Sequence, residues 1–451
     1  MKILHTSDWH LGRTLHGVDL HDAQRTFIDH LVDLVQRHDV AAVLISGDVY
    51  DRAIPAVQTV ELFSDALRRL SDLTTVVVTP GNHDSASRLG FGAHIMRDSV
   101  RILADPSGIA DPVVLECDGR PLAIYGIPYL DPDAARSVLD VDERSHTAVL
   151  TAAMDRVRSD LARRPGARAV VMAHAFVVGA EPSDSERDLS IGGVQSVPST
   201  VFDGVDYVAL GHLHGPQIVP VPDSPTVARY SGSPLAFSFS ERHHAKSVTL
   251  VDLSGDRPHI DLLPLPVPRP LTELRGSLEH LQSSDTDHAV DHWVKAIVTD
   301  PALPLDLQAT LRARFPHVLH IAHEPVGPAA GTDVPVVSET MSPAAVTADF
   351  VEFVTHQAPD QIELDVIDDQ LPADFKERDA IAAKRVGALL GAILDVTRPT
   401  AVLTWGITDR YTWVPIWYKR SDGYANRPLP LDENYREKPM MRTIKQAVAG
   451  A

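Results

Sequence analysis

Five short apolar segments of this chain each end in polar side chains that can bind a metal ion. The segments are residues 2–4, 41–45, 75–78, 169–172 and 207–210. Runs of this length and composition predict buried strands of an α/β sheet. Open α/β sheets bind their ligands just beyond the carboxyl ends of the strands. The polar residues found there are Asp8, His10, Asp48, Asn82, His174, His212 and His214.

This set offers carboxylate, amide and imidazole ligands but no thiolate, a combination that suits divalent metal ions. Two aspartates, one asparagine and four histidines are too many for one ion, but they suit two ions that share a carboxylate. Two ions ~3.5–4 Å apart can bind a phosphate group and activate a bridging water. A lone His-x-His pair more often has a structural or surface role, so the prediction of phosphoester hydrolysis depends on the whole ordered series.

The order of these residues resembles the metal-binding pattern of the calcineurin-like metallophosphoesterases. The motifs DxH, GD, GNHD, H and GHxH occur at residues 8–10, 47–48, 81–84, 174 and 211–214. Residues 5–12, 47–51 and 230–235 are further similar to bacterial SbcD-type nuclease subunits, and the resemblance covers roughly residues 1–360. It implies an α/β fold, a four-layer α-β-β-α sandwich with a small α+β capping domain.

The resemblance also implies the roles of individual residues. It gives two ligand sets that share Asp48, with Asp8, His10 and His214 on one ion and Asn82, His174 and His212 on the other. Manganese is favoured because it accepts oxygen and nitrogen ligands and because the family nucleases use it, with iron and zinc as alternatives.

Three further residues near Asp48 are candidates for catalysis. His83 is expected to protonate or stabilise the leaving group, and Asp51 to orient His83, although similar archaeal nucleases carry a histidine at the position of Asp51. Arg52 either contacts phosphate or is an ordinary surface arginine. Asp84 is expected to accept hydrogen bonds from the turn rather than to bind metal.

The pattern of apolar residues divides the chain into several parts. Residues 1–265 alternate strands with helices at 21–37, 56–70 and 147–163, and a closing pair of strands is expected at 248–253 and 260–263. Four prolines between residues 264 and 270 predict a semi-rigid linker. Residues 271–340 are expected to form the capping domain, with strands at 293–298 and 317–323 and a helix at 305–315. Residues 341–360 contain an amphipathic helix that either docks on an SbcC-type ATPase or packs on its own domain.

Residues 361–451 resemble instead the C-terminal part of a retaining (β/α)₈ xylanase. The resemblance depends on Trp405-Gly406 and on residues 428–435, and Glu363 stands at the position of the nucleophile. A second carboxylic acid and the preceding strands of a barrel are absent. This tail is therefore expected to be a fusion remnant without glycosidase activity.

Composition constrains the partners and the compartment. A net charge of −20 argues against broad electrostatic binding to DNA, so affinity must come from bound metals, local basic patches or a partner. A single cysteine, Cys117, excludes an internal disulfide and favours the cytoplasm. No signal peptide or apolar run of ~20 residues is present, so no membrane association is expected. The chain has no GxxxxGK[ST] motif, so any ATP dependence must come from a partner.

Three functions remain open. The first, implied by the SbcD resemblance, is a 3′-to-5′ double-strand exonuclease and hairpin endonuclease for DNA repair, recombination and replication, working as a homodimer with an SbcC-type ATPase. The second is another phosphatase or small-molecule phosphodiesterase, since residues 48–52 also resemble phosphoprotein phosphatases. The third is a carbohydrate-active or carbohydrate-binding protein that uses Trp405, Trp413 and Trp417. The capping segment and residues 230–235 favour the nuclease.

Overall fold

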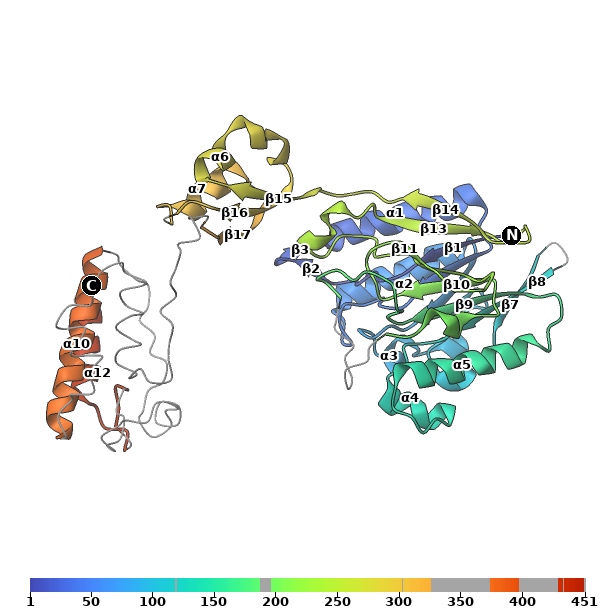
Figure 1. Cartoon of the computed structure of the whole chain (residues 1–451), viewed down its shortest axis with the longest axis horizontal. Helices are drawn as coiled ribbons and strands as arrows, with labels where there is room; N and C mark the ends of the chain where they lie inside the picture. The colour runs from blue at the N-terminus through green and yellow to red at the C-terminus, as the bar shows by residue number, and fades with distance from the viewer. Residues whose placement is uncertain are drawn as a thin grey trace. The chain divides into compact units, whose positions relative to one another are not determined.

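The structure is a computed structural model that describes residues 1–117, 120–186, 196–301, 303–325, 374–396, 429–432 and 434–449 (Figure 1). The chain divides into two compact units, Met1–Val326 and Gly327–Ala451. All the candidate metal ligands, together with Asp51, Arg52 and His83, lie in the first unit.

The first sheet of this unit has the strand order β14-β13-β1-β4-β5-β6. Its strands are β1 (Lys2–Thr6), β4 (Ala42–Ser46), β5 (Thr75–Thr79), β6 (Val100–Ile102), β13 (Ser247–Asp252) and β14 (His259–Pro264). Strands β1, β4, β5 and β6 are parallel, whereas β13 and β14 are antiparallel to their neighbours. The predicted closing pair of strands is thereby confirmed as the antiparallel edge of a mixed sheet.

The second sheet has the order β11-β12-β10-β9-β8-β7. Its strands are β7 (Val113–Cys117), β8 (Arg120–Gly126), β9 (Arg168–His174), β10 (Tyr207–Gly211), β11 (Gln217–Val219) and β12 (Val227–Tyr230). Strands β8, β9, β10 and β12 are parallel, and β7 and β11 form antiparallel edges. The parallel strands thus occupy the centre of the second sheet, whereas in the first sheet they extend to the edge strand β6.

The two sheets pack face to face through an apolar layer that includes Ile3 and Leu44 from the first sheet and Ile124 and Met172 from the second. Helices α1 (His21–His38) and α2 (Val57–Ser71) bury apolar side chains on the outer face of the first sheet. Helices α4 (Pro132–Leu139) and α5 (His146–Leu161) cover the second sheet, and α1 and α5 lie on opposite sides in Figure 1. Strands buried on both faces explain the nearly continuous apolar runs in the sequence.

Short elements fill the connections between these layers. They are β2 (Thr14–Leu15), β3 (Val18–Asp19), α3 (Ala86–Leu89), and the 3₁₀ helices η1 (Ala93–Ile95), η2 (Pro106–Gly108), η3 (Ser199–Phe202) and η4 (Phe239–His243).

A smaller α+β structure follows the proline-rich segment. Its parallel sheet has β15 (Leu271–Gly276), β16 (Trp293–Val298) and β17 (Val318–His323), with α6 (Leu278–Gln282), η5 (Ser284–Ala289) and α7 (Leu307–Arg314). It has a core of its own, centred on Leu281, Val294 and Phe315. Trp293 and Leu319 pack against a second cluster, which contains Leu15, Leu20, Leu235 and Phe237 of the sandwich.

The second unit is described only in part. Helices α10 (Phe375–Val396) and α12 (Pro439–Ala449) pack against each other, and an isolated bridge joins Leu431 to Glu437. Within residues 374–396, 429–432 and 434–449 these elements do not show a barrel. Glu363, Trp405, Trp413, Trp417 and the helix expected at 341–360 lie outside the described residues. None of the described helices has both the length and the apolar composition of a bilayer span.

Candidate metal centre

The predicted ligands follow parallel strands of both sheets. Asp8, Asp48 and Asn82 come after β1, β4 and β5 of the first sheet, while His174 ends β9 and His212 follows β10 of the second sheet. The loops are tied together by backbone hydrogen bonds, with the Asp8 amide donating to the carbonyl of Gly47 over 3.0 Å. The edge at which the strands end thus brings side chains from distant parts of the chain to one place.

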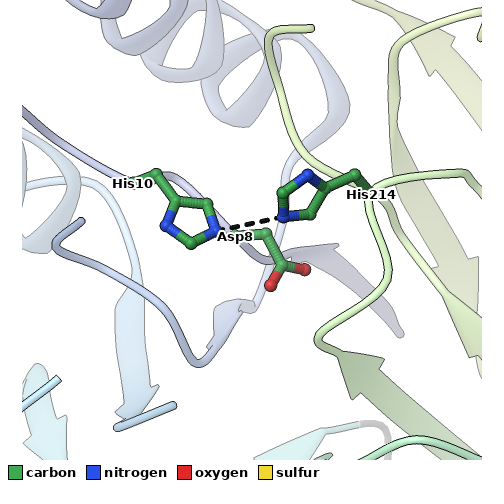
Figure 2. A group of neighbouring side chains, drawn as sticks. All are labelled: Asp8, His10 and His214. Carbon is green, nitrogen blue, oxygen red and sulfur yellow. Dashed lines mark hydrogen bonds between the residues drawn. The ribbon is translucent and has the colours of Figure 1, made fainter. Parts of the chain in front are cut away.

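The first ligand group consists of Asp8, His10 and His214, whose candidate ligand atoms all lie within 4.8 Å of one another. Figure 2 shows the two imidazole rings with their nitrogens directed toward each other above the Asp8 carboxylate, and His10 Nε2 lies 3.1 Å from His214 Nε2. All three residues are at most 1% exposed. Two imidazole nitrogens and a buried carboxylate directed at one point fit a divalent cation.

The second ligand group consists of Asp48, His174 and His212, again within 4.8 Å of one another. The side-chain oxygen of Asn82 lies 2.9 Å from His174 Nε2 and 3.3 Å from His212 Nδ1. The donor set fits a second divalent ion, and it contains the residues that the sequence assigned to that ion.

Asp48 lies between the two groups. Its Oδ2 atom is 3.6 Å from His10 Nε2 and 3.4 Å from His174 Nε2. Its other oxygen, Oδ1, accepts a hydrogen bond of 2.9 Å from the backbone N–H of His83. One carboxylate oxygen therefore faces both groups, an arrangement that suits a shared ligand.

The backbone at the ligands is strained. Asp8, His10, Asp48 and His212 have φ values of 54°, 42°, 48° and 111°. Such conformations cost on the order of 1–3 kcal/mol each in residues other than glycine and are concentrated at functional sites. Gly47 allows the turn into Asp48, because its φ is +85° and a Cβ atom there would lie 2.2 Å from His174 Nδ1.

Burial and close charges perturb the ionisation of the ligands. Burial raises the pKa of Asp8 to about 6. Burial also lowers the pKa of His212 to about 3, which keeps it neutral, as a metal ligand must be. At His174, burial opposes the charged imidazolium, but the Asp48 and Asp8 carboxylates and the Ser46 carbonyl together outweigh burial and raise the pKa to about 9. In the metal-free protein His174 is therefore a ligand that holds a proton near neutral pH.

His83 lies beside the ligands and is 6% exposed. Its Nδ1 atom is 2.8 Å from the backbone carbonyl oxygen of Asp51, and its Nε2 atom is 3.9 Å from Asp48 Oδ2. His10, Asp48 and His83 also form a possible metal-binding group. The geometry thus allows His83 to act either as the proposed acid or as a ligand.

The carboxylate of Asp51 contacts different residues from those expected from the sequence. It lies 3.7 Å from His10 Nδ1 and 3.6 Å from both Arg13 Nη1 and Arg52 Nε. The side chain of Arg52 is 82% exposed, so it could reach a ligand in solvent. Arg13 was not identified in the sequence, although it follows the first motif closely.

Asp84 accepts hydrogen bonds of 2.9–3.0 Å from the backbone N–H groups of Val49, Tyr50 and Gly81. This is the structural role expected from the sequence.

A cavity of about 270 Å³ opens beside the ligand groups. Its lining includes Arg13, Asp51, Arg52, His83 and Ser185. Two arginines and a histidine next to a pair of cation sites can bind an anionic phosphate.

Comparison with known proteins agrees with this geometry. The sequence model of the calcineurin-like phosphoesterase family matches residues 1–216. The model described as the type 5 capsule protein repressor C-terminal domain matches residues 267–355, and glycosyl hydrolase family 10 matches residues 330–447. The xylanase resemblance is thereby confirmed, but its match begins before residue 361 and overlaps the preceding one.

Individual relatives are also similar. The SbcD subunit of the nuclease SbcCD from Bacillus subtilis is 36% identical over 264 residues, which cover 56% of this chain and 66% of that protein. The corresponding SbcD subunit from Escherichia coli K12 is 30% identical over 321 residues, which cover 69% of this chain and 78% of that protein. A dimetal phosphatase structure from Danio rerio aligns with 59% of this chain and 97% of its own at 11% identity and a TM-score of 0.39, too low to add to the assignment. The chain belongs to the SbcD family, whose N-terminal part is a calcineurin-like phosphoesterase domain.

Proposed function

We propose that this protein is a two-metal DNA phosphodiesterase that serves as the nuclease subunit of a complex with an SbcC-type ATPase. The observation that carries the proposal is the position of Asp48, whose Oδ2 atom faces His10 and His174 at 3.6 and 3.4 Å. The similarity to the SbcD subunits of the SbcCD nucleases from two bacteria supports DNA as the substrate. The expected activities are 3′-to-5′ exonuclease on duplex ends and endonuclease on hairpins.

Two sets of residues would hold the two metal ions needed for phosphodiester hydrolysis. The first group and Asp48 would hold one divalent ion, and the second group with Asn82 and Asp48 would hold the other. Bound ions of this kind supply charge to the phosphate and a water of lowered pKa. Manganese is the proposed metal, because the donor set contains oxygen and nitrogen but no sulfur.

His83 is the proposed proton donor to the leaving oxygen. Its Nδ1–H donates to the carbonyl of Asp51 over 2.8 Å, which fixes the ring, and the transferred proton is assigned to Nε2. Arg13 and Arg52 line the adjacent cavity and are proposed to bind phosphate oxygens. These arginines offer local positive charge in a protein whose net charge is −20.

The remaining assignments follow from the family. We propose that residues 1–265 form the nuclease domain, that residues 271–340 act as the cap, and that residues 341–360 dock on the ATPase. A homodimer within the complex and a cytoplasmic location are part of the same proposal. The tail, residues 361–451, is proposed to have no glycosidase activity.

The test uses the purified full chain with Mn²⁺ and three substrates: end-labelled linear duplex DNA, a DNA hairpin, and a phosphodiester dye. The Asp48→Ala variant is the control for contaminating nucleases. Cleavage of DNA that depends on Mn²⁺ and on Asp48 supports the proposal. Cleavage of the dye alone would favour a small-molecule phosphodiesterase, and two bound ions without cleavage of any substrate would reject the proposal.

A further inference from the structure

The two ligand groups differ in what holds their histidines. In the second group, His174 Nδ1 lies 3.1 Å from the backbone carbonyl oxygen of Ser46. No side-chain substitution can remove that carbonyl. In the first group, His214 Nδ1 lies 2.6 Å from the hydroxyl oxygen of Ser185. The orientation of His214 therefore depends on a side chain 29 residues away in the sequence.

The direction of the hydrogen bond at His214 follows from the partners of Ser185. The Ser185 hydroxyl donates to Glu241 Oε1 over 2.6 Å, so its oxygen is left to accept the Nδ1–H of His214. The lone pair of His214 is then on Nε2, the atom that faces His10 in the first group. A carboxylate at the end of such a chain raises the basicity of a metal-binding imidazole and fixes its tautomer.

Glu241 is itself held firmly. Its Oε1 atom also accepts the backbone N–H of Phe237 over 3.0 Å, and its Oε2 atom forms an ion pair with Lys246. The Lys246 ammonium completes its contacts with the backbone carbonyl of His214 at 3.0 Å and with Ser233 Oγ at 2.8 Å. Glu241 is 1% exposed and Lys246 is 7% exposed, so water does not replace these contacts.

An ion pair as buried as this one is a weak source of stability, because desolvation offsets most of its attraction. Well-packed apolar residues would stabilise this position about as well. Its contacts converge on one residue, His214, through both the imidazole and the backbone carbonyl. Arg13 adds a further link, since its Nη2 donates to the carbonyl of Ser185 over 2.8 Å.

We propose that Ser185, Glu241 and Lys246 are positioning residues that set the metal affinity of the first group through His214, while the second group is independent of them. This inference rests on the proposed two-metal site and assigns roles to residues that bind no metal themselves. It makes the first ion position adjustable through side chains that bind no metal, whereas His174 of the second group is held at Nδ1 by a backbone carbonyl.

The test is a Mn²⁺ titration of the full chain by calorimetry and by electron paramagnetic resonance, which separates single ions from coupled pairs. Loss of such an outer contact typically weakens metal affinity ~10–100-fold. We expect Ser185→Ala to weaken one of the two binding steps to this extent and to leave the other at its wild-type Kd. Adding His212→Ala should then abolish the retained step, which assigns it to the second group.

Glu241→Gln is the second variant, because it keeps the shape of the side chain and removes its charge. It should weaken the same step. Asp160→Asn is the matched control: Asp160 is also a buried carboxylate with ion-pair partners, but it bonds Tyr125, Arg163 and Arg164 rather than a ligand histidine. Thermal melting of the metal-free variants identifies any loss of fold.

The outcomes separate the inference from the function on which it rests. Wild-type protein that never binds a second ion rejects the two-metal proposal itself. Two ions bound with unchanged affinities in both Ser185→Ala and Glu241→Gln reject the positioning role alone. An equal loss of Mn²⁺ affinity in both binding steps would also overturn the positioning role, because the effect would then be general. The same loss of affinity in Asp160→Asn would overturn it for the same reason.

Discussion

His83 is held by the backbone of Asp51: its Nδ1 atom lies 2.8 Å from the Asp51 carbonyl oxygen. A backbone acceptor persists through any substitution of the side chain. The ring of His83 therefore keeps one orientation, with Nε2 directed toward the Asp48 side of the site at 3.9 Å from Oδ2.

The first prediction concerns His83. We expect His83→Ala to retain both ions and DNA binding but to lose most turnover, because general acids typically contribute ~10²–10⁴-fold. The measurement combines single-turnover kinetics with metal analysis. A variant that loses one ion would identify His83 as a ligand, which the group of His10, Asp48 and His83 also permits.

The second prediction concerns Asp51. Asp51→Asn should reduce turnover less than His83→Ala, because the carbonyl that orients His83 remains. The substitution removes charge near His10, Arg13 and Arg52, each within 3.7 Å of the carboxylate. We therefore expect a change in KM for DNA rather than in the pH profile of kcat. A pH profile as altered as that of His83→Ala would show that the carboxylate itself is part of the proton transfer.

The third prediction concerns Asp48. Asp48→Ala should abolish binding of both ions, because its Oδ2 atom faces both ligand groups. Asp84→Asn is the comparison, since Asp84 is a neighbouring carboxylate bonded to backbone amides. Full nuclease activity of Asp48→Ala with two ions bound would contradict the shared-ligand assignment.

The fourth prediction concerns pH. In the metal-free protein burial lowers the pKa of His174, but the Asp48 and Asp8 carboxylates and the Ser46 carbonyl together raise it from 6.5 to about 9. A metal ion must displace this proton, so apparent affinity should rise with pH and level off above about 9. The stability that the ion pair of His174 and Asp48 adds to the metal-free protein has the opposite pH dependence. It is fully present below pH 6.5 and is lost as the pH rises through about 9.

Calorimetry in buffers of different ionisation enthalpy measures this proton release directly. The release at about pH 7 should vanish in His174→Ala, which has no proton to lose at that position. Metal binding that is independent of pH in the wild-type protein would show that His174 is neutral before the ion arrives.

Much of this site could be predicted because each ligand follows an apolar run. His174 is the clearest case. It ends β9, and a histidine directly after a run of apolar residues indicates a functional side chain at the end of a buried strand. The helices predicted at 21–37, 56–70 and 147–163 were also confirmed, with ends that differ by at most two residues. Periodic burial on one helix face is a local property that the sequence carries.

Other features depend on long-range contacts and could not be predicted. Glu241 occurs in the polar segment Ser-Glu-Arg-His-His, which is typical of an exposed loop, yet its carboxylate is buried against Ser185, 56 residues earlier. Strand β15 (Leu271–Gly276) has no apolar run and was missed, because it gains its partner only when β16 pairs with it. The role of Ser185 could not be predicted either, because a single serine in a loop belongs to no sequence pattern that indicates its contacts.

The fifth prediction concerns the tail. Every proposed ligand lies before residue 215, and every described contact of the two ligand groups lies within the unit Met1–Val326. Deleting residues 361–451 should therefore leave Mn²⁺ binding and DNA cleavage unchanged, while the full chain should hydrolyse no xylan, because retaining hydrolysis needs a second carboxylic acid across the scissile bond. Metal titration and xylan digestion of the full and shortened chains provide the measurement, with Glu363→Gln as the control for any xylanase signal. Loss of metal binding on deletion, or xylan cleavage that disappears in Glu363→Gln, would mean that the tail is a working part of the protein rather than a fused remnant.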